Sequence, residues 1–272
     1  MLNLKRNSKG ELVPAPGIRT RSSSIYDPSD SKPFNISRSK FSDFLTCPRC
    51  FYLDRVKGLA SPDTPGWTLN ETTDFLLKKE FDECREAQIA HRSFEKAGLK
   101  NIVPFAHSEM DNWRNSLHHG LKYEIPDTNI TLSGGIDDIW QDIISEQLIV
   151  VDYKSQASSY PVNTEDYLNG TYHQGYKLQM DFYAFLLTKM GFDVAPIAYF
   201  YVCNADRLAS GFGGKMTFEE TLVPYHWDSS WIEPKIYEML EALNSDTMPG
   251  SNIACENCAY SRERAIMEKG LA

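Results

Sequence analysis

The sequence lacks an apolar run long enough to cross a membrane. Its longest nearly apolar stretch, residues 194–203, is about half of the roughly 20 residues that a membrane-spanning helix needs. The first ten residues also lack the apolar segment of a secretory signal. We therefore expect a cytoplasmic protein that does not contact membranes, in a compartment where thiols stay reduced.

Basic residues are also in short supply. The 272 residues include 28 Lys and Arg against 37 Asp and Glu, a formal net charge of −9. This balance argues against a protein that coats nucleic acid, because phosphate binding needs clustered cations. It does not exclude a metal-dependent nuclease, whose metal ligands are carboxylates. Hydrophobic residues make up 42% of the chain, so wholesale disorder, a coiled coil and a collagen-like fibre are excluded.

The first 36 residues differ in composition from the rest. They contain four prolines and three consecutive serines, and six basic residues against three acidic ones. We predict a flexible basic tail over residues 1–36 and a single domain over residues 37–272. Within that domain, hydrophobic periodicity predicts helices beginning near residues 39, 70, 172 and 230, and strands at residues 131–142, 148–155, 194–202 and 217–225. This order is typical of a mixed α/β fold with a central sheet.

An acid and a cation stand two positions apart at the end of an apolar strand. Asp152 and Lys154 follow the run Leu-Ile-Val-Val, and side chains two residues apart in a strand point to the same face. Upstream lie Gly134, Gly135 and the pair Asp137-Asp138. If the two strands form a hairpin, one of these aspartates approaches Asp152. Close carboxylates repel unless a divalent cation neutralises them, which suggests metal-assisted phosphodiester hydrolysis. The alternative is a salt bridge at a strand end.

The cysteines are grouped in a way that favours metal binding. Four of the six form two Cys-x-x-Cys pairs, Cys47/Cys50 and Cys255/Cys258, whose thiolates can share one ion or cluster. The pairs are about 200 positions apart, much farther than in a compact zinc ribbon, so the fold must bring them together. We expect the remaining two, Cys84 and Cys203, to be small core residues.

Three motifs in order resemble those of the PD-(D/E)XK nuclease superfamily. They are Gly134-x-x-Asp137, Asp152-x-Lys154 and Gln179-x-x-x-Tyr183, the last on one face of the helix expected near residue 172. Within the superfamily they are similar to the RecB-like branch, which includes the AddB nuclease domain and the CRISPR-associated RecB-like exonucleases. Two further segments resemble that branch, Cys47-Pro48-Arg49 and Cys255-x-x-Cys258. Together the matches cover residues 39–258.

The resemblance implies a mixed central sheet flanked by helices and a set of site residues. Asp137, Asp152 and the backbone carbonyl of Tyr153 would bind Mg²⁺ or Mn²⁺, and Lys154 would assist the attacking water. Gln179 and Tyr183, on the helix, would contact the substrate or organise the site. A further metal ligand is expected on an earlier helix, for which we choose Glu80, with His91 and Glu71 as alternatives.

The resemblance also implies a 4Fe–4S cluster held by Cys47, Cys50, Cys255 and Cys258. The RecB-like pattern has one upstream and three downstream cysteines, and here Arg264 occupies the expected last position. Cys50 can supply the missing ligand. This departure keeps a structural Zn²⁺ as an alternative.

From the resemblance we predict a DNA nuclease, and more narrowly an exonuclease that acts on single strands or duplex ends in DNA repair, recombination or related processing. A protein partner of recombination, replication or CRISPR type is compatible with it. The alternatives are a catalytically silent nuclease-fold module that binds DNA or a partner, and a nucleotide- or RNA-processing enzyme. Basic residues near the cysteine pairs are candidates for DNA contact, or else form an ordinary solvated face: Arg38, Lys40, Arg49, Arg55, Arg262 and Arg264.

Overall fold

The computed structural model describes residues 4–62 and 66–270, so residues 1–3 of the expected tail and residues 63–65 and 271–272 of the expected domain lie outside the described residues. The contacts divide the chain into two compact units. Unit 1 comprises residues 1–66, 124–131 and 231–272, and unit 2 comprises residues 67–123 and 132–230.

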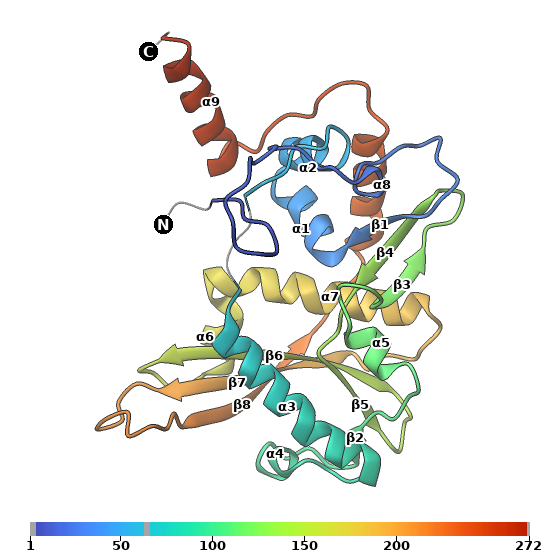
Figure 1. The fold of residues 1–272 in the computed structure, drawn as a ribbon. Helices are drawn as coiled ribbons and strands as arrows, with labels where there is room; N and C mark the ends of the chain where they lie inside the picture. The colour runs from blue at the N-terminus through green and yellow to red at the C-terminus, as the bar shows by residue number, and fades with distance from the viewer. Residues whose placement is uncertain (1–3, 63–65, 271–272) are drawn as a thin grey trace. The chain divides into compact units, whose positions relative to one another are not determined.

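Unit 2 is built on a five-stranded mixed sheet in the order β2-β5-β6-β7-β8 (Figure 1). The central pair β6 and β7 is parallel, and the other neighbours are antiparallel. A parallel pair needs a long crossover, and the segment between β6 and β7 supplies it with helices. The strands are β2 (Ile102–Pro104), β5 (Asp138–Asp142), β6 (Leu148–Ser158), β7 (Ile197–Asp206) and β8 (Phe218–His226).

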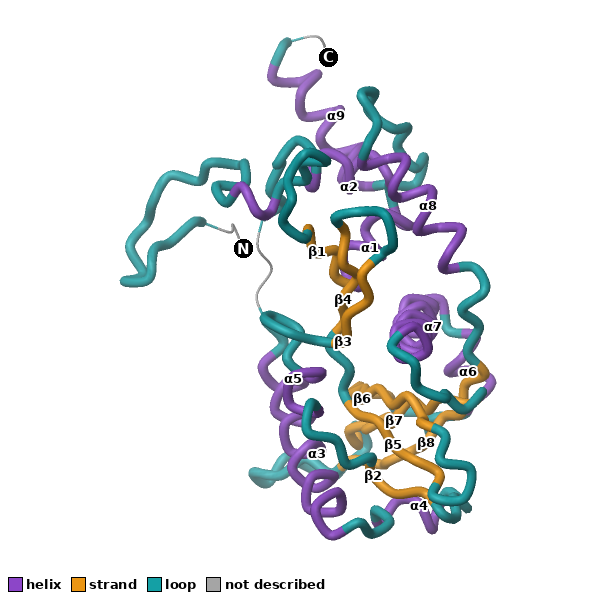
Figure 2. Tube along the Cα trace, turned by 90° about the vertical axis from the view of Figure 1, so that its right-hand side faces the viewer, coloured by secondary structure: helices purple, strands orange, loops and turns teal. Residues whose placement is uncertain are grey.

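The helices of unit 2 pack on the two faces of this sheet (Figure 2). Successive residues of β6 point to opposite faces. Val151 and Tyr153 share a buried cluster with Phe81 of α3, whereas Asp152 contacts Gln179 of α7. The sheet therefore lies between α3 and α7. The helices are α3 (Thr68–Ala87), α4 (Arg92–Lys96), α5 (Met110–Arg114), α6 (Thr164–Asn169) and α7 (Gln174–Lys189), with a short 3-10 turn, η2 (Thr171–His173), before α7.

An aromatic cluster fills the space between α3 and the sheet. Phe81 stacks on Trp140 with a ring-centroid distance of 5.5 Å, and Phe94 meets the same indole edge-on at 4.4 Å. Tyr153 and Tyr201 complete the cluster around Phe81. Such pairs add to the stabilisation that burial of their apolar area provides, and they fix the rotation of α3 against β6.

Unit 1 is a small helical unit with its own core. Phe41 and Phe51 are fully buried, and Phe51 meets Phe44 edge-on at 5.4 Å. Tyr26, from the expected tail, is also buried and donates a hydrogen bond to Asn244. The elements are η1 (Ser22–Ser24), β1 (Phe34–Ser37), α1 (Arg38–Thr46), α2 (Pro48–Arg55), α8 (Ile232–Leu243) and α9 (Glu256–Glu268).

The strand expected at residues 131–142 is divided in two by the structure. Its first part is β4 (Ile130–Gly134), which joins β3 (Leu121–Glu124) and β1 in a three-stranded sheet of order β1-β4-β3, and its second part is β5. The cause is local: Ile136 donates its backbone N–H to the carbonyl of Trp113 rather than to a strand. The chain passes between the units along β3 and β4.

The predicted mixed α/β class is confirmed, with a mixed sheet between helices. Helix α9 was not predicted, because its 13 residues bury no side chain and so carry no apolar period. Among the described residues, no helix combines the length and the apolar character needed to span a membrane.

Candidate active site and cysteine site

Asp137 and Asp152 are brought together by the hairpin of β5 and β6. Asp137 precedes β5, and the register pairs Asp138 with Val151. The backbone N–H of Tyr153 donates a 2.9 Å hydrogen bond to Asp137 Oδ2, and the two carboxyl groups lie within hydrogen-bond reach of each other. The hairpin therefore gives a pair of neighbouring carboxyl groups, one of them at the end of the apolar run of β6.

Two glycines let the chain turn into this position. A Cβ on Gly134 would lie 2.7 Å from Cε1 of Tyr183, and one on Gly135 would lie 2.5 Å from Cβ of Ser116. Any side chain at either place would displace its neighbour. The motif Gly134-x-x-Asp137 thus has a steric basis, because the turn that presents Asp137 passes against α7 on one side and the segment after α5 on the other.

Asp152 is the most deeply buried acid of the pair. Its side chain is fully inaccessible, it forms an ion pair with Lys154, and its Oδ1 accepts a 2.6 Å hydrogen bond from the Gln179 amide. Burial raises the pKa of Asp152 to about 7; the Lys154 ammonium opposes this rise, and the Asp137 carboxylate adds to it. A carboxyl group with such a pKa changes its charge near neutral pH and is typical of functional sites.

The helix α3 contributes an acid and a base that were not expected from the sequence. Asp74 forms a 2.8 Å ion pair with Lys78, and Lys78 Nζ lies 3.7 Å from Asp137 Oδ1. Oδ1 of Asp74 is buried and accepts no hydrogen bond. Burial, together with the charge of Asp137, raises the pKa of Asp74. The i, i+4 spacing of Asp74 and Lys78 was the available signal, but it is also typical of an ordinary helical ion pair.

Gln179 and Tyr183 lie one turn apart on α7 and both are buried. The Gln179 amide donates to Asp152 and, over 3.1 Å, to the Tyr183 hydroxyl. Of the two expected roles, burial and these bonds favour organising the site over contacting the substrate. A neighbour on the same helix, Tyr176, places its ring 4.7 Å from Lys154 Nζ, where the ring face attracts the ammonium.

Asp138 lies next to Asp137 in sequence but has a separate set of partners. It is fully buried and forms ion pairs with Arg85 and Arg114. It also accepts a 2.6 Å hydrogen bond from the hydroxyl of Tyr153. As expected from the alternation of a strand, one aspartate joins Asp152 and the other serves a buried charge network.

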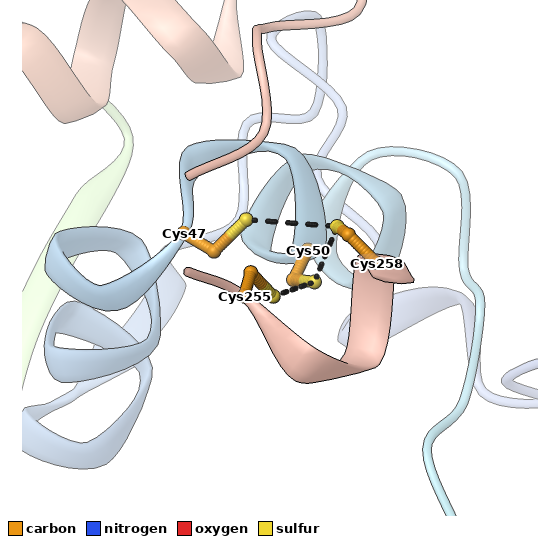
Figure 3. A group of neighbouring side chains, drawn as sticks. All are labelled: Cys47, Cys50, Cys255 and Cys258. Atoms are coloured by element: carbon orange, nitrogen blue, oxygen red, sulfur yellow. Dashed lines mark hydrogen bonds between the residues drawn. The ribbon is translucent and has the colours of Figure 1, made fainter. Parts of the chain in front are cut away.

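The four paired cysteines converge in unit 1 (Figure 3). Cys47 and Cys255 are the residues that precede α2 and α9, and Cys50 and Cys258 lie in the first turns of these helices. The sulfur atoms all lie within 4.8 Å of one another. Of the residues that the structure describes, these four form the one group of three or more His, Cys, Asp or Glu side chains close enough to share an ion.

The surroundings of the cysteines hold the two pairs together and lower the pKa of one thiol, whereas burial raises the pKa of Cys50 and Cys258. Arg49 donates a 3.0 Å hydrogen bond to the carbonyl of Pro249, and Asn252 donates one to the carbonyl of Thr46. Desolvation opposes ionisation of Cys47, but hydrogen bonds from backbone N–H groups and neighbouring thiols outweigh it and lower its pKa to about 7. Both pairs lie at helix N-termini, whose dipoles also favour negative charge.

Comparison with known proteins gives the family. The model of the PD-(D/E)XK nuclease superfamily matches residues 35–262, most of the chain. The chain belongs to the PD-(D/E)XK nuclease superfamily. A crystal structure from Eubacterium rectale, described as that of a candidate exonuclease, is 14% identical, with a TM-score of 0.39 over 90% of this chain and 94% of the other. No curated protein matches the sequence.

Membership of the superfamily does not decide the branch or the domain boundaries. The RecB-like branch stays a prediction, and so does a single nuclease domain over residues 37–272. The match to the PD-(D/E)XK model includes parts of both units. It begins at residue 35, close to the boundary expected at residue 37.

The structure shows where the candidates for the further metal ligand of this PD-(D/E)XK chain lie. Glu80 is half-exposed and contacts His91 at 3.2 Å and Arg92 at 3.1 Å. The ring of His91 is buried against Phe81 and also bonds Ser93. Glu71 is exposed in the first turn of α3. Glu80 and His91 therefore contact each other, whereas Asp74 lies close enough to Asp137 for their charges to interact.

The basic residues expected near the cysteines all lie in unit 1, where several are already paired. Lys40 and Arg55 both pair with Asp54, at 2.9 and 3.0 Å, and they and Arg19 lower the pKa of Asp54 to about 2 against the opposing effect of burial. Three more are held locally: Arg49 by Pro249, Arg262 by Glu263 and Arg264 by Glu268. The Nε atom of Arg38 is buried without a hydrogen bond. DNA contact by these residues stays a prediction.

Proposed function

We propose that this chain is a divalent-metal-dependent deoxyribonuclease, an exonuclease that acts on single strands or duplex ends in DNA repair, recombination or related processing. The observation that carries the proposal is the state of Asp152. Its carboxyl group is fully buried next to Asp137 and Lys154, and its pKa is raised by that burial to about 7. Burying an acid among other charges costs free energy, and a cation bound between the two carboxylates would offset that cost.

The residues present fit Mg²⁺ or Mn²⁺. Hard divalent cations of this kind take one or two carboxylates, with water and phosphate oxygens as the remaining ligands. Asp137 and Asp152 would hold the ion, with the backbone carbonyl of Tyr153. Asp74 is the acid of α3 that we propose in place of Glu80, because its buried Oδ1 accepts no hydrogen bond and the charge of Asp137 acts on it.

The two lysines of the site have different places relative to the carboxylates. Lys78 lies between Asp74 and Asp137, and Lys154 contacts Asp152. A divalent cation supplies charge for neutralising the phosphate and acidity for its bound water. The cation would take over from Lys78 the screening of Asp74 and Asp137. It would also neutralise Asp152, so that Lys154 is available to face the scissile phosphate.

In the proposed reaction, a water oxygen attacks phosphorus in line with the bond that breaks. The attacking water gives up one proton to solvent as the new oxygen–phosphorus bond forms. The opposite phosphorus–oxygen bond breaks with its electron pair on the leaving oxygen, which takes a proton from solvent. Lys154 orients the water and stabilises the negative charge that develops on the phosphoryl oxygens. Gln179 holds Asp152 and the Tyr153 N–H holds Asp137, so both carboxylates keep their orientation during the reaction.

The direct test is cleavage of end-labelled single-stranded and duplex DNA with Mg²⁺, Mn²⁺ or EDTA. We expect activity with either ion and none with EDTA. Lys154→Ala and Asp152→Asn should each lower kcat by about 10²–10³-fold. The matched control is Asp166→Asn, the same change at an exposed acid of α6, which should leave kcat unchanged.

Two outcomes would contradict the proposal. Full activity of Lys154→Ala and Asp152→Asn would place the chemistry elsewhere. DNA binding without cleavage under any divalent ion would instead support a silent nuclease-fold module. Covalently closed circular DNA, which has no ends, tests the exonuclease mode separately, because it should resist cleavage.

A further inference from the structure

We infer that unit 1 binds a single Zn²⁺ through Cys47, Cys50, Cys255 and Cys258, in place of the 4Fe–4S cluster that the resemblance to RecB-like nucleases implies. The inference goes beyond the proposed nuclease activity and does not depend on it. It rests on the spacing of the four sulfur atoms, on the absence of a hydrophobic anchor for α9, and on the affinity order of metals for thiolates.

The spacing of the sulfur atoms fits one tetrahedral ion. Three of the sulfur–sulfur distances are 3.8 Å for Cys47 and Cys258, 3.6 Å for Cys50 and Cys255, and 3.4 Å for Cys50 and Cys258. Four thiolates at Zn–S bonds of about 2.3 Å in a tetrahedron lie about 3.8 Å from one another. Every sulfur here lies within 4.8 Å of every other, so one ion can reach all four with small side-chain adjustments.

A four-iron cluster does not fit this spacing. The irons and sulfides of a 4Fe–4S cube lie between its ligands, so the thiolate sulfurs bound to different irons are about 6 Å apart. All six sulfur pairs here are closer than that, since none exceeds 4.8 Å. A two-iron cluster meets the same difficulty for the sulfurs on opposite irons. Both clusters would require α2 and α9 to move apart.

The same four sulfurs could hold a single iron, so the choice of metal needs a chemical argument. Tetrahedral thiolate sites take zinc or iron, and affinity for divalent ions at a given site rises from Fe²⁺ toward Zn²⁺. Zinc also has no redox chemistry, which suits a site with a structural role. The set is closed, with four protein ligands and no place for water, as in structural zinc sites.

The position of α9 indicates what the metal does. This helix has 13 residues, none of them buried, so no hydrophobic face holds it to the rest of unit 1. An isolated helix of this length is marginal in water. Cys255 and Cys258, however, lie at the start of this helix, opposite Cys47 and Cys50 at the start of α2 (Figure 3). The zinc would join two segments of unit 1 that are distant in sequence and would fix the start of α9.

The test is metal analysis of the full-length protein purified without oxygen, so that an oxygen-sensitive cluster would survive. We expect about one zinc per chain, little iron and no broad visible absorption. X-ray absorption at the zinc edge should show four sulfur neighbours at about 2.3 Å. Brown protein with about four irons and sulfide, one iron per chain, or no bound metal would each overturn the inference.

Variants separate this site from the catalytic one. Cys258→Ser should lose most of the bound zinc and should make the chain near α9 more sensitive to limited proteolysis. The matched control is Cys84→Ser on α3, which should retain one zinc per chain. If Cys258→Ser keeps its zinc, the inference is wrong; if it is insoluble, the metal content and absorption spectrum of the unmodified protein still decide the question.

Discussion

The side-chain amide of Gln179 on α7 donates a 2.6 Å hydrogen bond to Oδ1 of Asp152 on β6. The bond joins a helix to the sheet at a fully buried carboxyl group whose pKa is raised by burial to about 7. A hydrogen bond donated to an ionised carboxylate favours the ionised form. Gln179 is therefore a positioning residue that also keeps the pKa of Asp152 lower than it would otherwise be.

Replacing Gln179 by leucine should change the pH dependence of cleavage. Without the amide the pKa of Asp152 rises, so a smaller fraction is ionised at pH 7. We expect the acidic limb of the pH–rate profile to move up by about one unit, since a hydrogen bond to a charged group contributes roughly 1.5–3 kcal/mol. The control is Gln174→Leu, at an exposed position on the same helix. An unmoved profile with reduced activity would show that Gln179 has only a packing role.

Binding of Mg²⁺ should strengthen as the pH rises through 7. The carboxyl group of Asp152 must lose its proton to bind the cation, and its raised pKa places that loss near neutral pH. Below that pKa the affinity should rise by up to about tenfold per pH unit, and above it the affinity should level off. Titration calorimetry at pH 6 and pH 8 measures the difference. Asp152→Asn, which has no proton to lose, should bind weakly at both values.

The helix α3 offers a direct choice between two acids. Asp74→Asn should raise the Mg²⁺ concentration needed for half-maximal activity by about 10–100-fold, as is typical when a metal site loses a supporting group. Glu80→Gln is the matched control on the same helix and should leave it unchanged, because Glu80 pairs with His91 and Arg92. The reverse pattern would restore Glu80 as the α3 ligand.

How far the sequence predicts the site depends on the kind of element. Strand alternation alone places Asp152 and Lys154 on one face, and the structure pairs them. A helix with many acids gives no such answer, because its rotation is set by packing. Phe81 is buried among aromatic rings, and this orientation places Asp74, rather than Glu80, near Asp137.

Long-range features were accessible from the sequence only in outline. Two Cys-x-x-Cys pairs predict that the pairs meet, and the structure confirms that the four sulfurs gather. Which metal they suit depends on sulfur–sulfur distances, which spacing in sequence does not contain. The break between β4 and β5 was also hidden, because apolar alternation continues through it while the backbone of Ile136 bonds to Trp113.

Two adjacent aspartates should respond differently to the same substitution. Asp138→Asn removes a fully buried anionic partner of Arg85 and Arg114, which also pair with the more exposed Asp82; loss of one side of a buried ion pair costs up to about 3–5 kcal/mol. Asp137→Asn should abolish activity and lower the free energy of unfolding by less than about 1 kcal/mol, because Asp137 is partly exposed. Urea unfolding monitored by circular dichroism, beside the cleavage assay, measures both effects.

Two glycines of unit 2 should also give opposite results when replaced by alanine. At Gly134 the new Cβ would lie 2.7 Å from the ring of Tyr183, so α7 must shift, and we expect a loss of about 1–3 kcal/mol in the free energy of unfolding. At Gly175, in the first turn of α7, no atom lies within 4 Å of the new Cβ. That substitution should be neutral or stabilise the protein by up to about 1 kcal/mol, because alanine restricts the unfolded chain and favours the helix.

Since Tyr183 accepts a hydrogen bond from Gln179, a ring displaced by Gly134→Ala should also disturb Asp152. Cleavage activity should therefore fall in Gly134→Ala and persist in Gly175→Ala; equal stability and activity in the two variants would contradict the steric account of the glycine motif.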